Sequence, residues 1–120
     1  MKKEFAAFKA AFNGLFHLWF HERHGRFHFA AMLLALAGGW LFGISKMEWI
    51  AVLLCIGLVT GLEALNSALE QALDRVHPEK HPAVGRAKDL AAGAVLIAAL
   101  CAGVVGILIY GPYILLAFGI

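Results

Sequence analysis

Residues 49–74, WIAVLLCIGLVTGLEALNSALEQALD, decide the fold of this chain. The first half of this stretch, up to Thr60, carries no charged residue. Such a run predicts a helix that enters a membrane, because about 20 apolar residues cross the hydrocarbon core. The second half adds polar residues at spacings of 3, 4 and 4: Glu63, Asn66, Glu70 and Asp74. These positions share one face of an α-helix, along which the polar stripe rises ~16 Å.

The composition of the whole chain supports a membrane location. Hydrophobic residues make up 62% of the 120 positions, against roughly 45–50% in soluble domains. A soluble domain of this size has too little interior to bury that much apolar surface. The composition also excludes a disordered chain, and the two cysteines, both in apolar runs, are interpreted as buried hydrophobic residues. The net charge of +2 gives no indication of a nucleic-acid partner.

Further segments complete an all-α integral membrane fold in one domain, residues 1–120. Large apolar residues of segment 1–26 fall on one helical face and predict an amphipathic helix in the membrane interface; a helix packed on a soluble partner is the alternative. The transmembrane helices are expected at 27–44, 49–73 and 90–118, with a short turn near Gly43. Two prolines, Pro78 and Pro82, predict a loop over 76–87.

Positive charges predict the orientation of the spans. Five basic residues precede the first span and four lie between the second and third, whereas Lys46 stands alone in the opposite loop. The N-terminus and the 76–87 loop are therefore expected in the cytoplasm and the C-terminus outside. Small residues also recur at four-residue spacing, a pattern that lets helices pack closely and favours self-association: Gly39/Gly43, Gly57/Gly61, Ala99/Gly103 and Ala102/Gly106.

The polar stripe is the candidate functional site. Glu63 lies within the apolar run, where a carboxylate is expensive and rare unless it is functional, and a desolvated carboxylate suits a general base. A structural carboxylate satisfied by neighbouring helices is the alternative. Five acidic residues are expected at the cytoplasmic end, a donor set that suits Mg²⁺: Glu22, Glu63, Glu70, Asp74 and Asp89. Lys88 is a candidate phosphate contact, and Asp89 alternatively caps a helix.

Two further patterns bear on ligands. Four histidines, His17, His21, His24 and His28, follow helical spacing, and a transition-metal site is one interpretation of them. The sequence has no glycine-rich phosphate-binding loop. Any nucleotide site would therefore use side chains and Mg²⁺.

The motifs together resemble the bacterial diacylglycerol kinase/undecaprenol kinase family of small membrane lipid kinases. The resemblance rests on Glu63-x-x-Asn66-Ser67-Ala68-x-Glu70-x-x-x-Asp74, on Pro78-Glu79-x-His81 and on Ala87-Lys88-Asp89. Upstream, Glu22-Arg23-x-x-Arg26-x-His28 also looks like the family. The resemblance implies a homotrimer that uses ATP and Mg²⁺ to phosphorylate a lipid hydroxyl at the cytoplasmic face.

The same resemblance implies roles for individual residues. Glu63 would be the general base, supported by Asn66 and Asp74, and Glu22 and Glu70 would hold the metal with the ATP phosphates. Nucleotide contacts would come from Glu79, His81, Lys88 and Asp89. The N-terminal motif looks more like undecaprenol kinases, so undecaprenol is favoured over diacylglycerol. Two non-enzymatic alternatives use the same carboxylates: an ion or proton carrier, and a membrane scaffold. The apolar outer halves of the spans favour a one-sided site over a carrier.

Overall fold

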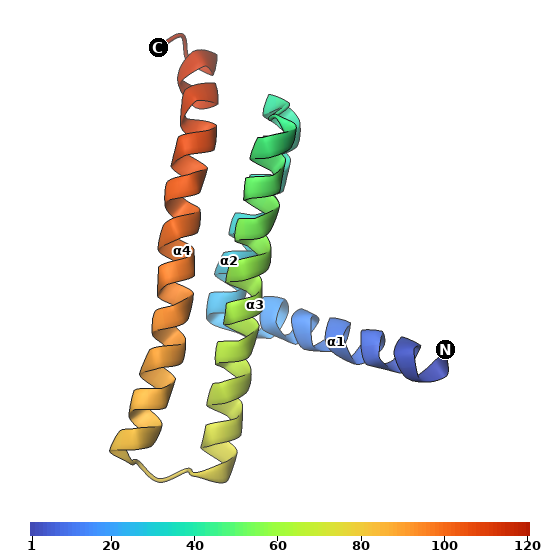
Figure 1. Cartoon of the computed structure of the whole chain (residues 1–120), viewed down its shortest axis with the longest axis vertical. Coiled ribbons are helices and arrows are strands. Elements are labelled where there is room, and N and C mark those ends of the chain that lie inside the picture. Colours follow the sequence, from blue (N-terminus) through green and yellow to red (C-terminus); the bar gives the residue numbers. More distant parts are fainter.

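A computed structural model describes residues 1–120 as four helices and no strand. The helices are α1 (Lys2–His21), α2 (Arg23–Phe42), α3 (Lys46–Val76) and α4 (Pro82–Ala117). In Figure 1, α2, α3 and α4 run side by side along the long axis, and α1 leaves them at a steep angle. The three long helices are apolar and long enough to cross a membrane, which confirms the predicted all-α membrane architecture.

The corner between α1 and α2 corrects the first predicted boundary. The sequence predicts an interfacial helix that continues to residue 26, but α1 ends at His21, and Glu22 is extended (φ −103°, ψ 137°). The first span accordingly begins at Arg23 rather than at residue 27. Gly25 is buried against the Leu18 carbonyl, and a Cβ at position 25 would lie 1.9 Å from that oxygen. A glycine here therefore permits the close approach of the two helices.

The turn between α2 and α3 lies at the predicted place, and local chemistry explains it. Gly43 adopts the left-handed conformation (φ 61°) and ends α2, a position that favours glycine because it lacks Cβ. Ser45 and Glu48 then form a capping box: the Ser45 hydroxyl accepts from Glu48 N, and Glu48 Oε1 accepts from Ser45 N at 2.9 Å. The cap starts α3 at Lys46, three residues before the predicted boundary.

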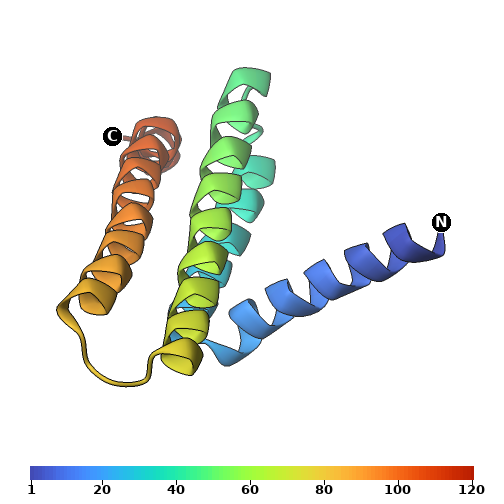
Figure 2. The same ribbon diagram turned by 60° about the horizontal axis from the view of Figure 1, so that its bottom comes forward.

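The predicted loop over 76–87 is wrong for most of its length. Only residues 77–81 connect α3 to α4, as the turn in Figure 2 shows, and Pro82 occupies the first turn of α4. Proline fits that position because its missing N–H has no partner in the first turn of a helix. At the other end, α4 continues through Pro112 to Ala117.

Packing inside one chain is sparse. Only ten of the 120 residues are buried, and the core cluster consists of Ile44, Val52 and Ile109. Large apolar side chains along all three spans are exposed, a surface compatible with lipid rather than water. Of the small-residue pairs, Gly39 packs against Trp49, whereas Gly43 is the cap described above. A Cβ added to any other glycine of these pairs would meet nothing within 4 Å, so no close approach of helices within the chain requires a glycine at these positions.

Candidate functional site

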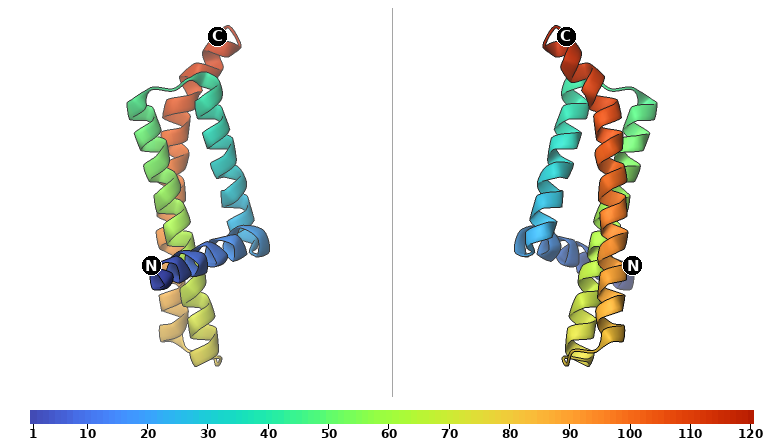
Figure 3. Two further views of the ribbon diagram at one scale, coloured as in Figure 1. Left: turned by 90° about the vertical axis from the view of Figure 1, so that its right-hand side faces the viewer. Right: turned by 90° about the vertical axis from the view of Figure 1, so that its left-hand side faces the viewer.

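The stretch of α3 that carries the polar stripe also meets α1, although none of the four stripe residues lines the cavity between the two helices. The side chains of α1 and α3 line a cavity of about 360 Å³ that includes Ser67 and Gln71. Beyond this crossing, the hairpin end of α3 and α4 projects past α1, as both views of Figure 3 show. The stripe therefore starts inside the helix bundle and continues into the projecting end.

Glu63 is the most deeply buried polar residue of the stripe, with 6% of its surface exposed. Its Oε2 and the Oδ1 of Asn66 are both buried without a hydrogen bond. Such atoms usually have partners in folded proteins, because an unpaired buried acceptor costs about 1–3 kcal/mol. Two unsatisfied acceptors one helical turn apart can therefore receive donors from a ligand.

His28 lies beside this carboxylate. His28 Nε2 is 3.1 Å from Glu63 Oε2, and both side chains are largely buried. The contact has the distance of an ion pair but not the angles of a hydrogen bond. It links the start of α2 to the middle of α3.

Glu22 reaches α3 one turn further along. Ser67 Oγ donates to Glu22 Oε1, and Gln71 Nε2 lies 3.4 Å from the same oxygen and 3.2 Å from Ser67 Oγ. The extended backbone at Glu22 makes this possible, because it interrupts the helix at the residue that faces α3. Glu22 is thus held by two side chains while its second oxygen has no partner among the hydrogen bonds of the chain.

The hairpin formed by α3, the 77–81 loop and α4 brings the Ala87-Lys88-Asp89 motif close to the end of the polar stripe. Lys88 Nζ forms a salt bridge with Asp74 Oδ1 across the two helices. Asp89 and Glu70 are exposed and contact no other charged side chain. The structure therefore joins Lys88 to the end of the stripe and leaves two carboxylates open to solvent.

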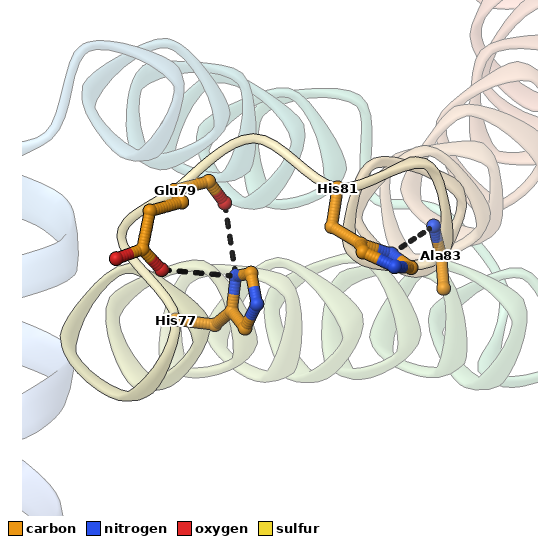
Figure 4. A network of polar contacts seen from close by, with 4 residues as sticks. All are labelled: His77, Glu79, His81 and Ala83. Carbon is orange, nitrogen blue, oxygen red and sulfur yellow. Dashed lines mark hydrogen bonds and ion pairs between the residues drawn. The ribbon is translucent and has the colours of Figure 1, made fainter.

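The connecting loop has a local role in the structure (Figure 4). His77 Nδ1 lies 2.9 Å from the Glu79 backbone oxygen and 4.0 Å from its carboxylate. His81 caps α4, because its Nδ1 accepts from Ala83 N at 3.0 Å. Neither Glu79 nor His81 contacts the stripe, so their predicted nucleotide contacts stay a prediction.

The structure does not gather the five predicted acidic residues into one cluster: Glu22, Glu63 and Asp74 each take a separate partner, and Glu70 and Asp89 take none. No three His, Cys, Asp or Glu side chains come together closely enough to hold a metal ion, which also applies to the four N-terminal histidines. The rings of His17 and His21 pack edge to face instead. Mg²⁺ does not need three protein ligands, since it usually binds one or two carboxylates plus substrate phosphates. Carboxylate oxygens at Glu22 and Glu70 fit that chemistry.

Sequence reasoning assigns no individual role to Ser67, Gln71 or His28. Ser67 and Gln71 are four residues apart, so the sequence already indicates that these two polar side chains share a face of α3. Their partner is not readable from the sequence, because it depends on the break at Glu22.

Fold and site define an all-helical membrane protein with a carboxylate site where an amphipathic helix crosses the spans. The family described as prokaryotic diacylglycerol kinase matches residues 9–110. Undecaprenol kinase of Bacillus subtilis (strain 168) is 37% identical over 112 residues, which cover 93% of this chain and 91% of that protein. Diacylglycerol kinase of Escherichia coli (strain K12) is 35% identical over 92 residues, 77% of this chain and 75% of the relative. Diacylglycerol kinase of Haemophilus influenzae is 40% identical over 83 residues, 68% and 69% of the two chains.

The chain belongs to the prokaryotic diacylglycerol kinase family of membrane lipid kinases. This confirms the family that the motifs resemble and the assignment as an enzyme. It favours the kinase over the carrier and the scaffold.

Proposed function

We propose that this kinase transfers the γ-phosphoryl group of Mg²⁺-ATP to the hydroxyl of a membrane lipid, with ADP as the leaving group. The single observation that carries the proposal is the buried carboxylate of Glu63 with its unsatisfied oxygen. Phosphoryl transfer depends on positioning and charge stabilisation more than on covalent chemistry. A fixed carboxylate among polar partners can supply the positioning.

Glu63 is the proposed general base. A base must lie within hydrogen-bond reach of the proton that it accepts. The Glu63 carboxylate and Oδ1 of Asn66 accept no hydrogen bond within the chain, so a lipid hydroxyl that enters from the bilayer finds both groups available. Glu63 would take the hydroxyl proton as the oxygen attacks phosphorus, and Asn66 would orient the hydroxyl.

Glu22 and Glu70 are the residues that would hold Mg²⁺. Ser67 and Gln71 fix one oxygen of Glu22, and Glu70 is exposed on the same helix as these two donors. When bound, the ion would neutralise charge on the ATP phosphates. Lys88, paired with Asp74, and its neighbour Asp89 lie at the projecting end, where they would contact the nucleotide. Glu79 and His81 are proposed to line the same region from the loop.

The lipid is proposed to be undecaprenol rather than diacylglycerol. The undecaprenol kinase of Bacillus subtilis aligns with 93% of this chain, and the N-terminal motif with Glu22 and His28 looks like that type. The excess of basic residues before the first span and around the 77–81 loop supports a cytoplasmic position for this end of the molecule. Glycines at four-residue spacing that no close contact within the chain requires, together with the sparse core, support assembly as a homotrimer.

The test is phosphate transfer from labelled ATP in mixed micelles, with undecaprenol and diacylglycerol as separate acceptors, with and without Mg²⁺. We expect labelled lipid only with Mg²⁺ and with higher kcat/KM for undecaprenol. Glu63→Gln should lower turnover about 10²–10⁴-fold, the usual contribution of a general base. Glu48→Gln is the matched control, because Glu48 lies at the other end of the same helix and glutamine also fits the capping box. A folded wild-type protein that labels neither lipid would contradict the proposal.

A further inference from the structure

His28 and Glu63 form a buried contact that the proposed reaction does not yet use. His28 is the only basic side chain within 4 Å of the Glu63 carboxylate, because the other ion pairs of the chain involve Glu4, Glu79 and Asp74. A carboxylate that is removed from water needs a compensating partner. Within one chain, His28 is the group in position to act as that partner.

The α1–α2 corner sets the register of this contact. Glu22 forms the corner and His28 follows it on α2, and the two residues reach Ser67 and Glu63, which are one helical turn apart on α3. The corner therefore docks on α3 through two polar contacts at once. A displacement of α2 along α3 would move His28 relative to Glu63, the proposed base, and would move Glu22, the proposed metal ligand, with it.

His28 also faces a second space. Its side chain lines a cavity of about 530 Å³ between α2, α3 and α4, whose other lining residues are mostly apolar, with Thr60 and Tyr110 among the exceptions. The imidazole thus lies between an apolar cavity and the buried carboxylate. His17, His21 and His24 line neither this cavity nor Glu63.

We propose that His28 is a positioning residue for Glu63. This inference rests on the proposed function, in which Glu63 is the base. The Nε2–H of His28 holds Oε2, so that the carboxylate has one orientation and Oε1 is directed to the lipid hydroxyl. Without substrate, the contact between His28 Nε2 and Glu63 Oε2 lacks the angles of a hydrogen bond. In the reacting complex these angles become favourable, as is common for catalytic hydrogen bonds. Misplacing a reacting group by about 1 Å costs on the order of 10²-fold in rate.

Three substitutions of His28 separate positioning from packing. His28→Gln keeps an N–H donor near the position of Nε2, whereas His28→Asn carries the same amide one methylene shorter and does not reach Oε2. His28→Leu keeps the volume and removes the donor. His24→Gln is the matched control, since His24 is an exposed histidine one turn earlier on α2.

We expect kcat to fall about 10- to 100-fold in His28→Leu and His28→Asn, because a misplaced reacting group costs up to about 10²-fold in rate. His28→Gln should recover kcat to within about five-fold of wild type, and KM for Mg²⁺-ATP should stay within about two-fold in all three. In a Glu63→Gln background, His28→Leu should cause no further loss, because the two residues act as a unit.

Several outcomes would overturn the role of His28. They are wild-type turnover in His28→Leu, an equal loss in the Gln and Asn variants, or a loss that appears in KM for Mg²⁺-ATP instead of kcat. If the leucine variant does not fold, the Gln and Asn pair decides the question. Wild type and Glu63→Gln are assayed alongside, so failure of the kinase proposal appears in wild type itself, whereas failure of this inference leaves wild type active.

Discussion

Gly25→Ala tests whether the α1–α2 corner organises the site. Ordinary van der Waals contact begins at 3.4 Å, and the new Cβ would lie 1.9 Å from the Leu18 carbonyl oxygen, so the two helices must separate by about 1.5 Å. Overpacking of this kind costs about 1–3 kcal/mol. The same displacement moves Glu22 away from Ser67 and His28 away from Glu63. Since about 1 Å of misplacement costs on the order of 10²-fold in rate, we expect turnover to fall by at least that factor.

The assay for Gly25→Ala is lipid phosphorylation with labelled ATP, together with thermal unfolding in detergent. Gly85→Ala is the matched control, because a Cβ at that helical position meets nothing within 4 Å. The control should keep wild-type turnover and gain stability of about 0.5–1 kcal/mol, the usual difference between alanine and glycine in a helix. If Gly25→Ala retained wild-type turnover and stability, the corner would not be what places Glu22 and His28.

Three further predictions concern the two ends of α3. Glu70→Gln should raise the Mg²⁺-ATP concentration needed for half-maximal turnover about ten-fold, within the range for lost metal-site groups, and an unchanged value would remove Glu70 from the metal site. Ser67→Ala removes the hydroxyl that donates to Glu22. The Mg²⁺ concentration needed for half-maximal turnover should rise about three-fold, which is less than for a lost ligand. A lower concentration than in wild type would show that Ser67 competes with the ion for Glu22. Tyr113→Phe removes the 2.6 Å hydrogen bond to Glu48 at the far end; the midpoint of thermal unfolding should fall while kcat stays within about two-fold of wild type, as expected away from the site.

The helices themselves are predictable because each depends on local sequence. Long apolar runs require helices in a membrane, where every backbone polar group needs an internal partner. The turn at Gly43 is also predictable, because a left-handed cap needs a glycine there. The start of α4 is not, since Pro82 indicates a loop by its residue type and instead occupies the first helical turn. Proline occurs both in loops and in the first turn of helices. The cap of His81 on α4 distinguishes the two cases here, and it is visible only in the structure.

The candidate site, like the fold, has a part that the sequence predicts and a part that it does not. The spacing of Glu63, Asn66, Glu70 and Asp74 places them on one helix face without any structure, because helical periodicity alone fixes which residues share a face. The pairing of Lys88 with Asp74 follows less directly, from two antiparallel helices and a short connection.

The sequence by itself determined the membrane class, the helices, the polar stripe on α3 and the motifs of the lipid kinase family. Only the tertiary structure decided which partner each carboxylate takes. The break at Glu22 turns α1 away from α2 and places Glu22 on Ser67 and His28 on Glu63. The physical reason is that these contacts join residues 35 or more positions apart. Their geometry depends on the close packing of Gly25 against Leu18, and helical periodicity carries no information about such long-range packing.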